Sequence, residues 1–479
     1  MPRPSAVRAP ATRDQADAYR FGLRRMEAAL VRGDPVPLHE QIRSQRRAAL
    51  AGVALGLLGI CVAALFARMA PSPRWTDAAV VIGADSGAMY VVAHGPDRLV
   101  PVANLPAARL VLAALRSGGS TDADPAKATP VTVPDGSLDG APRTPTAAVP
   151  GAVAVRPDST VPPRWAVCDR TTADGALVGT TVVAGMPTAP EPMPANDGVL
   201  LDGPDGVTWL VTGGRRHRVD AGDGRVLAAF GLTARVPRAA APDLVSLLPE
   251  GVALATPEVA GRGRPAPVGL PGRIGDVLTT RPVGGDPRHF VVLTGGLQEV
   301  PDLLAELLRV AAGQARDIPL GTDELAEAAL VGDLAVEGWP PGAPRLREPT
   351  DAPVVCWTWT AAGEPSTGGA VWAGGAEPAP AQPVSLAQAD GSGPKVDAVV
   401  AGSGGAVRAT GPGRSPAGGP LWLVSATGVA FGVADDATAA ALGITSAEPA
   451  PEAVLRLLPS GPALDLAAAG RMVDVLPAG

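Results

Sequence analysis

The chain has 479 residues, too many for one hydrophobic core, so the sequence predicts two or more structural units. Gly and Pro supply 59 and 53 residues and aromatic residues only 3%, which favours turns and short strands over long helices. The formal net charge is −7 although residues 1–47 are basic, and the acidic remainder argues against nucleic-acid binding.

A short amphipathic helix is expected over residues 13–32, within a cytoplasmic segment that comprises residues 1–47. Thr12 and Gln15 have the spacing of a capping box at its start, and Gly33 is expected to end it. Its apolar stripe, at steps of four, three and four, consists of Tyr19, Leu23, Met26 and Leu30. A helix this short cannot form a domain alone, so the stripe is expected to face the membrane surface or a partner protein.

Residues 48–67 form an apolar stretch without a charge and predict a transmembrane helix. At about 1.5 Å of helical rise per residue, the stretch would span roughly 30 Å, the thickness of a hydrocarbon core. A buried core helix and a cleaved signal peptide are the alternatives, but a signal peptide has a shorter apolar run and fewer residues before it. Gly52 and Gly56 would allow another helix to approach closely, and Cys61 is expected to be inert.

The orientation follows from the arginines at the two ends of this stretch. Arg43, Arg46 and Arg47 precede it, whereas Arg68 and Arg74 follow it. Because basic residues favour the cytoplasmic side, the chain is expected to be a single-pass protein of the cell (inner) membrane. Its N-terminus would be cytoplasmic and its C-terminal part extracytoplasmic.

One short pattern recurs after the apolar stretch: an apolar strand, a Gly-bearing turn and a second strand. Its copies are residues 89–102, 208–219, 290–300 and 421–433. Each predicts a β-hairpin followed by an Ala/Leu-rich helical stretch. The second and fourth copies continue alike, with LVSLLPEGVAL and VLRLLPSGPAL, which favours duplication over chance. Because the copies are unevenly spaced, a simple solenoid is not expected.

The predicted fold is therefore an elongated α+β extracytoplasmic part, in which four β-hairpin-plus-helix repeat modules surround a β-rich central domain. The expected boundaries are module 1 at 80–125, the first central part at 126–195, module 2 at 196–262, module 3 at 263–337, the second central part at 338–417 and module 4 at 418–479. Pro-, Gly-, Thr- and Ser-rich segments are expected to be loops or hinges: 120–150, 376–383 and 402–419.

Cys168 and Cys356 are the cysteines that follow the apolar stretch, one in each part of the expected central domain. In an oxidising compartment, two cysteines without a third competitor predict one disulfide, with two unrelated buried thiols as the alternative. Closing so long a loop would stabilise the fold by roughly 5 kcal/mol in the chain-entropy description. Trp357 and Trp359 are expected to pack against this disulfide.

No catalytic, cofactor-binding or metal-binding site is predicted, and no cofactor is expected. The chain lacks the Gly-Lys-Ser/Thr of a P-loop, a G-x-S-x-G elbow and an H-E-x-x-H helix. Its 4 histidines lie far apart in the sequence, so no metal cluster is visible. The glycine-rich residues 402–405 lack the lysine of a phosphate-binding loop and are expected to be flexible.

The run TRDQADAYRFGLRRMEAALVRGDP at 12–35 resembles the N-terminal signature of the EccB family, core membrane subunits of the type VII (ESX) secretion system of actinobacteria. The likeness continues in the family's order through RLVPVANLPAARLVL (98–112), NDGVLLDGPDGVTWLV (196–211) and HFVVLTGGLQEVPDLLAELLR (289–309). Matches therefore extend over nearly the whole chain.

This resemblance implies a structural role in a protein-secretion complex of the membrane. Its implied partners are other membrane subunits, among them an FtsK/SpoIIIE-like ATPase, and its exported part would be an external scaffold. The family's repeats are said to resemble cell-wall-binding modules, so a peptidoglycan-binding module is the alternative function. Some family members are labelled ATPases, which makes nucleotide hydrolysis a further alternative, although this chain has no Walker motif.

Overall fold

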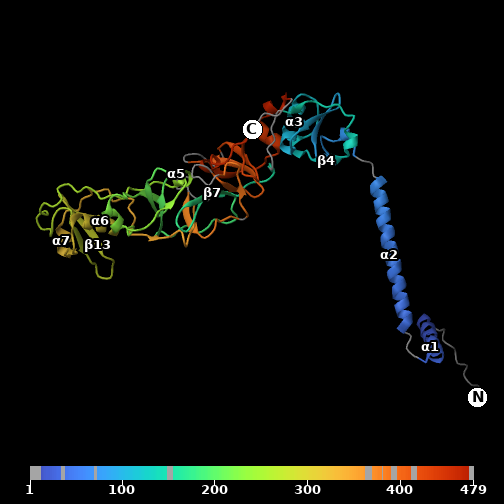
Figure 1. Cartoon of the computed structure of the whole chain (residues 1–479), viewed down its shortest axis with the longest axis horizontal. Coiled ribbons are helices and arrows are strands. Elements are labelled where there is room, and N and C mark those ends of the chain that lie inside the picture. Colours follow the sequence, from blue (N-terminus) through green and yellow to red (C-terminus); the bar gives the residue numbers. More distant parts are fainter. Residues whose placement is uncertain are drawn as a thin grey trace, which may run out of the picture. The chain divides into compact units, whose positions relative to one another are not determined.

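The computed structural model describes residues 12–33, 38–69, 73–147, 155–361, 369–379, 381–389, 396–411 and 418–473 (Figure 1). The chain divides into two compact units, Met1–Pro73 and Arg74–Gly479. The first unit is helical and the second is a mixed α+β body.

The first helix, α1 (Arg13–Arg32), begins and ends where the sequence predicts. The Thr12 hydroxyl oxygen accepts a hydrogen bond from the Gln15 N–H at 3.4 Å, and the Gln15 side chain accepts one from the Thr12 N–H at 3.1 Å. This reciprocal capping box satisfies two donors that a helix start otherwise leaves unpaired. Gly33 ends the helix at φ 69°, a left-handed conformation that glycine adopts without the steric cost of a side chain.

The second helix, α2 (Leu38–Met69), is 32 residues long and contains the expected membrane-spanning stretch. Its segment Gln45–Leu65 has a mean hydropathy of 2.4 and none of it is buried within the structure. Among the described residues, α2 is the one helix that is long and apolar enough to cross a membrane. The 21 residues of this segment extend roughly 30 Å along the helix axis, which matches the thickness of a bilayer core.

Four sheets of the second unit share one strand order, and each is named here after its first strand. The first strand is antiparallel to the second and parallel to the fourth. The β1 sheet contains β1 (Val80–Gly83), β2 (Met89–Ala93), β3 (Arg98–Val102) and β4 (Pro130–Val133). The β8 sheet contains β8 (Asp197–Asp202), β9 (Thr208–Thr212), β10 (Arg215–Arg218) and β11 (Arg238–Ala239), with β16 (Arg345–Leu346) also paired to β8.

The other two sheets follow later in the chain. The β12 sheet contains β12 (Val277–Thr280), β13 (Arg288–Leu293), β14 (Gly296–Val300) and β15 (Ile318–Pro319). The β21 sheet contains β21 (Gly405–Thr410), β22 (Leu421–Val424), β23 (Ala430–Gly432) and β24 (Glu448–Pro451). In all four, the second and third strands form an antiparallel hairpin at the segment where the sequence predicts one.

A helix connects the hairpin to the fourth strand in each sheet. These helices are α3 (Leu105–Ser117), α4 (Gly224–Ala229), α6 (Asp302–Ala312) and α8 (Asp436–Leu442). Asn104, Asp223 and Asp435 cap three of them by accepting a backbone N–H, as short polar side chains do at helix starts. The remaining helical elements are α5 (Pro242–Leu247), α7 (Thr322–Glu327), α9 (Glu452–Leu455), α10 (Leu466–Ala469), η1 (Trp75–Asp77), η2 (Pro125–Lys127) and η3 (Asp135–Ser137).

Both edges of these sheets are protected. A returning segment covers the hairpin edge through parallel bridges: Leu99 to Arg143, Val219 to Leu254, Leu297 to Leu330 and Val433 to Leu464. A proline lies in or next to the fourth strand at the opposite edge: Pro130, Pro237, Pro319 and Pro449. Because proline has no N–H to offer a further strand, it discourages pairing of this edge with another chain.

Two of the expected boundaries are wrong. The boundary after residue 125 places β4 in the central domain, yet β4 pairs with β1. The boundary before residue 418 places β21 there, yet β21 pairs with β22 and β24. Segments 120–150 and 402–419 therefore contain these strands and are not loops alone. Both strands are separated from their hairpin by Pro- or Gly-rich chain. This composition predicts loops and gives no sign that the strands pair with residues distant in sequence.

The β1 and β21 sheets share one hydrophobic core, although they come from opposite ends of the second unit. α3 packs against α8 and α10, and Leu110 and Leu442 are fully buried between the sheets. Arg109 of α3 donates a hydrogen bond to the Leu442 carbonyl oxygen at 2.7 Å. The two-stranded pair of β5 (Thr146–Ala147) and β25 (Met472–Val473) adds a second link between these ends.

The β8 and β12 sheets also pack through their helices, with α4 against α6. Leu303 and Leu307 of α6 lie in the core of the β8 sheet, whereas Leu308 lies in the core of its own β12 sheet. Trp339 packs against both cores, with its ring centroid 6.4 Å from that of Phe230. α6 is therefore shared by two sheets.

A six-stranded central sheet is built from two distant stretches of chain. In spatial order its strands are β18 (Ala370–Gly374), β17 (Val354–Thr360), β6 (Arg164–Thr171), β7 (Leu177–Ala184), β20 (Ala398–Val400) and β19 (Val384–Ser385). Cys168 of β6 lies directly opposite Cys356 of β17, and a disulfide with an S–S distance of 2.06 Å joins them. The predicted disulfide is confirmed.

The two faces of the central sheet pack in different cores. Cys168 and Cys356 belong to a small core against which Trp372 packs. Trp357 belongs to the large core on the other face, and Trp359 packs against that core too. The expectation that Trp357 and Trp359 contact the disulfide is wrong, because successive residues of a strand point to opposite faces. Trp372, opposite Cys356 on β18, has that position instead.

A buried carboxylate, that of Asp169, connects the central sheet to the β8 sheet. Asp169 accepts hydrogen bonds from the Ala241 N–H at 2.7 Å and from the Thr180 hydroxyl at 2.8 Å. Ala241 is the N-cap residue of α5, which packs against β6 and β17. Burial, helped by the nearby carboxylates of Asp243 and Asp397, raises the pKa of Asp169 to about 7 against the opposing effect of the two hydrogen bonds.

Replacing Cys168 by Ser should loosen the central sheet without affecting membrane insertion. Loss of a native disulfide costs about 2–5 kcal/mol, because the unfolded chain is no longer constrained. The measurement is limited proteolysis and the thermal midpoint of the full chain, with Cys61→Ser in α2 as the control. Wild-type protease resistance in Cys168→Ser would show that the bond is dispensable for the fold.

Asp169→Asn should remove one component of the pH dependence of stability. The raised pKa means that Asp169 stabilises the fold below about pH 4 and that this contribution is lost, by about 4 kcal/mol, as pH rises through about 7. The amide can accept from Ala241 and donate to Thr180, so the variant should match the wild type near pH 4 and be more stable near pH 8. Chemical denaturation across this range measures the difference, with the exposed Asp205→Asn as the control. Parallel curves for the wild type and Asp169→Asn would contradict the assignment.

Candidate functional site

The apolar stripe of α1 is exposed along its whole length. The relative exposures are 70% for Tyr19, 45% for Leu23, 60% for Met26 and 87% for Leu30. Four consecutive large apolar side chains on one helical face have no covering element among the described residues of this unit. Each would gain about 1.5–3 kcal/mol from full burial, which is sufficient to hold a partner helix or a membrane surface.

The apolar part of α2 presents its side chains in the same way. Leu50, Val53 and Ile60 are exposed, as is the thiol of Cys61. At Gly52 and Gly56, an added Cβ would meet no atom within 4 Å, so this strip of the helix is open to close approach. In a bilayer, lipid or another transmembrane helix can cover these positions.

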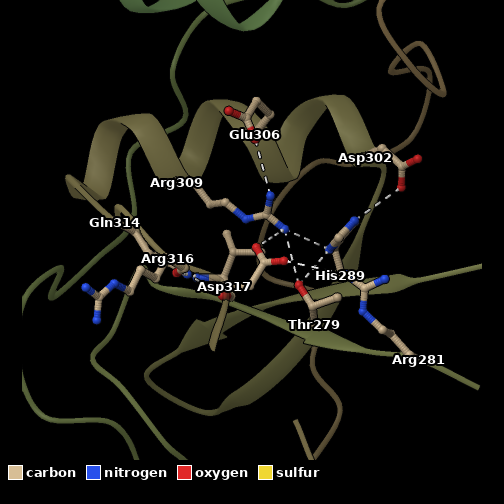
Figure 2. A network of polar contacts seen from close by, with 10 residues as sticks. Thr279, Arg281, His289, Asp302, Glu306, Arg309, Gln314, Arg316 and Asp317 are labelled. Atoms are coloured by element: carbon tan, nitrogen blue, oxygen red, sulfur yellow. Dashed lines mark hydrogen bonds and ion pairs between the residues drawn. The ribbon is translucent and has the colours of Figure 1, made fainter. Parts of the chain in front are cut away.

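One concentrated polar site in the second unit, which Figure 2 shows, was not predicted from the sequence. It lies where α6 crosses the β12 sheet. α6 contributes Asp302, Glu306 and Arg309, whereas β12 and β13 contribute Thr279 and His289. Asp317, next to the start of β15, and Arg281, just after β12, complete the cluster.

The Arg309 guanidinium is the centre of this polar site (Figure 2). Its Nη2 lies 3.1 Å from Nδ1 of His289 and donates to the Thr279 hydroxyl oxygen at 3.2 Å. The same guanidinium pairs with Asp317 at 3.4 Å and with Glu306 at 3.3 Å. Its Nε is buried without a hydrogen-bond partner among the described atoms, so the side chain already has one unsatisfied donor.

Both ring nitrogens of His289 face polar groups. Nδ1 lies 3.1 Å from the Thr279 hydroxyl as well as near Arg309, and Nε2 lies 3.7 Å from an Asp302 carboxylate oxygen. Because a guanidinium has only donors, Nδ1 accepts and the proton of the neutral ring is on Nε2. Burial and the charge of Arg309 lower the pKa of His289, against the smaller opposing effects of the Asp302 and Asp317 carboxylates.

The order Thr279–His289–Asp302 is superficially that of a hydroxyl nucleophile, a base and an orienting acid. The geometry does not support such chemistry. Arg309 already donates to the Thr279 oxygen, Thr279 is only 5% exposed, and the Asp302 contact is longer than a hydrogen bond. The cluster holds a helix on a sheet and does not activate a hydroxyl.

A depression of about 420 Å³ lies at the end of the β9–β10 hairpin. Thr208, Arg218 and Asp220 supply its polar side chains, and the apolar residues 253–255 also line it. Its lining contains neither a histidine nor a cysteine. Within the described ranges, no group of three or more His, Cys, Asp or Glu residues is arranged to hold a metal ion.

Sequence similarity to known proteins extends along nearly the whole chain. The family model for the type VII secretion system ESX-1, transport TM domain B (EccB), matches residues 8–478. The chain is 33% identical to the ESX-5 secretion system ATPase EccB5 of Mycobacterium marinum, covering 97% of this chain and 94% of that protein. It is 30% identical to the ESX-1 secretion system ATPase EccB1 of Mycolicibacterium smegmatis, covering 98% and 96%.

Solved structures show the same likeness. A chain in the structure of an intact ESX-5 inner membrane complex matches with a TM-score of 0.68 and 31% identity, covering 99% of this chain and 98% of that one. A chain of the EccB3 dimer from the ESX-3 core complex matches with a TM-score of 0.65 and 28% identity, covering 82% and 100%. The exposed α1 and α2, the disulfide-linked body and these matches lead to one conclusion: the chain belongs to the EccB family of type VII secretion proteins.

Proposed function

We propose that this chain is a structural subunit of a type VII (ESX) secretion complex of the membrane. The observation that carries the proposal is its match, over 99% of its length, to a chain of an intact ESX-5 inner membrane complex. The exposed apolar side chains of α1 and α2 support it, because a chain that works alone gains nothing from leaving them uncovered.

The partners of α1 are other membrane subunits on the cytoplasmic side, among them an FtsK/SpoIIIE-like ATPase. Tyr19, Leu23, Met26 and Leu30 form the contact, and Gly52 and Gly56 of α2 allow a neighbouring transmembrane helix to pack closely. The charge distribution supports an N-terminus in the cytoplasm and a second unit outside. The disulfide supports this orientation, since such bonds persist in oxidising compartments.

The external part works as a scaffold of four repeat modules around the central sheet. The shared strand order of the β1, β8, β12 and β21 sheets supports this division. β4 extends module 1 to at least residue 133, and β21 moves the start of module 4 to about residue 405. Paired packing of modules 1 with 4 and 2 with 3 gives the scaffold its internal connections.

Leu23→Ser with Met26→Ser should release this chain from its partners. Loss of two apolar contacts of about 1.5–3 kcal/mol each predicts a drop of at least about tenfold in the amount of intact complex recovered from gently solubilised membranes. Phe21→Ser is the matched control: Phe21 is also exposed, but at about 100° per residue it points away from the stripe. Intact complex from the double variant, with the exported part retained on purified peptidoglycan, would favour a cell-wall-binding module instead.

Nucleotide hydrolysis is the remaining alternative, since the relatives are named ATPases. The chain lacks a P-loop sequence, and in the α6 cluster the Thr279 hydroxyl oxygen already accepts from Arg309. We therefore expect the purified full chain to turn over ATP no faster than a heat-denatured sample. Turnover that co-purifies with the folded chain and survives removal of every partner ATPase would contradict the structural role as its sole function.

A further inference from the structure

α6 is held on two sides by different kinds of contact. Leu303 and Leu307 pack in the core of the β8 sheet, an apolar contact that pH does not change. On the side of its own sheet, α6 adds to its apolar contacts the polar contacts of Arg309 with Thr279 and His289 (Figure 2). Any change at these polar contacts therefore acts on the helix that joins the two sheets.

The contact between Arg309 and His289 requires a neutral imidazole. Nδ1 has a lone pair only when the ring is uncharged, and the guanidinium 3.1 Å away offers only N–H donors. A proton on Nδ1 would place two donors and two positive charges against each other. Arg309 has little freedom to retreat, because Glu306 pairs with its Nη1 and Asp317 with its Nη2.

The other charged groups around His289 do not offset this repulsion. Asp302 lies 3.7 Å from Nε2 and is largely exposed, so solvent screens its attraction for a charged ring. Asp317 is already shared between Arg309 at 3.4 Å and Arg281 at 3.7 Å. Two arginines therefore oppose protonation of His289, whereas Asp302 and Asp317 favour it only weakly.

We propose that His289 and Arg309 form a proton-sensitive latch on α6. With a neutral ring the latch holds α6 against β12 and β13, and protonation of His289 opens it and loosens the packing between the β12 and β8 sheets. The released state binds the proton more readily. The latch therefore stabilises α6 fully at pH values above the ordinary histidine pKa, and this stabilisation is lost as the pH falls below that pKa. This inference goes beyond the structural role proposed above and does not depend on it.

The test is hydrogen exchange of the full chain in detergent at about pH 7.5 and about pH 5, corrected for the intrinsic pH dependence of exchange. Protection of the α6 peptide should fall at least about fivefold at the lower pH, whereas α3 should keep its protection. In His289→Asn, the side-chain oxygen takes the place of Nδ1 and accepts from Arg309 but does not titrate. This variant should keep α6 protected at both pH values.

His94→Asn is the control, because it makes the same substitution at a histidine that contacts Asp97 in the β2–β3 turn at 2.8 Å, away from α6. It should retain the wild-type response of α6. If α6 and α3 of the wild type respond alike, the latch does not exist. An equal response in His289→Asn and the wild type would likewise overturn the proposal, since another group would then cause the loosening. Should His289→Asn not fold, the wild-type comparison of α6 with α3 decides alone.

Discussion

The pairing of β6 with β17, fixed by the Cys168–Cys356 disulfide, is the constraint on which the second unit depends. The two cysteines are 188 residues apart in sequence, yet they lie directly opposite each other on adjacent strands of the sheet. Everything in the β8 and β12 sheets lies in the loop that this pairing closes. A long loop is entropically unfavourable to close, so a covalent link at its base stabilises the arrangement most effectively.

The central sheet in turn positions the β8 and β21 sheets on one of its faces. α5 of the β8 sheet packs against β6 and β17, and β24 of the β21 sheet contacts β6. In α5 and α9 the residues that turn inward are apolar and buried, such as Leu244 and Val454. α7 follows the fourth strand of the β12 sheet, as α5 and α9 follow the fourth strands of theirs, but it has no fully buried residue. This sheet instead depends on α6 and Trp339 for its attachment to its neighbour.

Two polar positions give these attachments opposite responses to pH. Asp169 has its pKa raised by burial, so its buried position between the central sheet and α5 favours the fold most when the carboxyl is neutral, at low pH. His289 has its pKa lowered by burial and by Arg309, so the contact of α6 with its own sheet is strongest when the ring is neutral, at higher pH. In both cases the low-dielectric interior favours the uncharged form.

The sequence by itself determined the features that depend on neighbours in the chain. The capping box of α1, the apolar length of α2 and the four hairpins are local, because backbone geometry and side-chain periodicity suffice to specify them. The disulfide could also be inferred, since Cys168 had one possible partner outside the membrane-spanning stretch.

Only the tertiary structure decided what depends on residues that are distant in sequence. β4 and β21 are strands because β1 and β24 accept them as parallel neighbours, and no local pattern carries that information. Side chains alternate between the two faces of the sheet along β17, so the face on which Trp357 lies follows once the face of Cys356 is known. His289, Thr279 and Arg309 meet because a sheet and a crossing helix bring three elements together, and spacing in the sequence gives no sign of it.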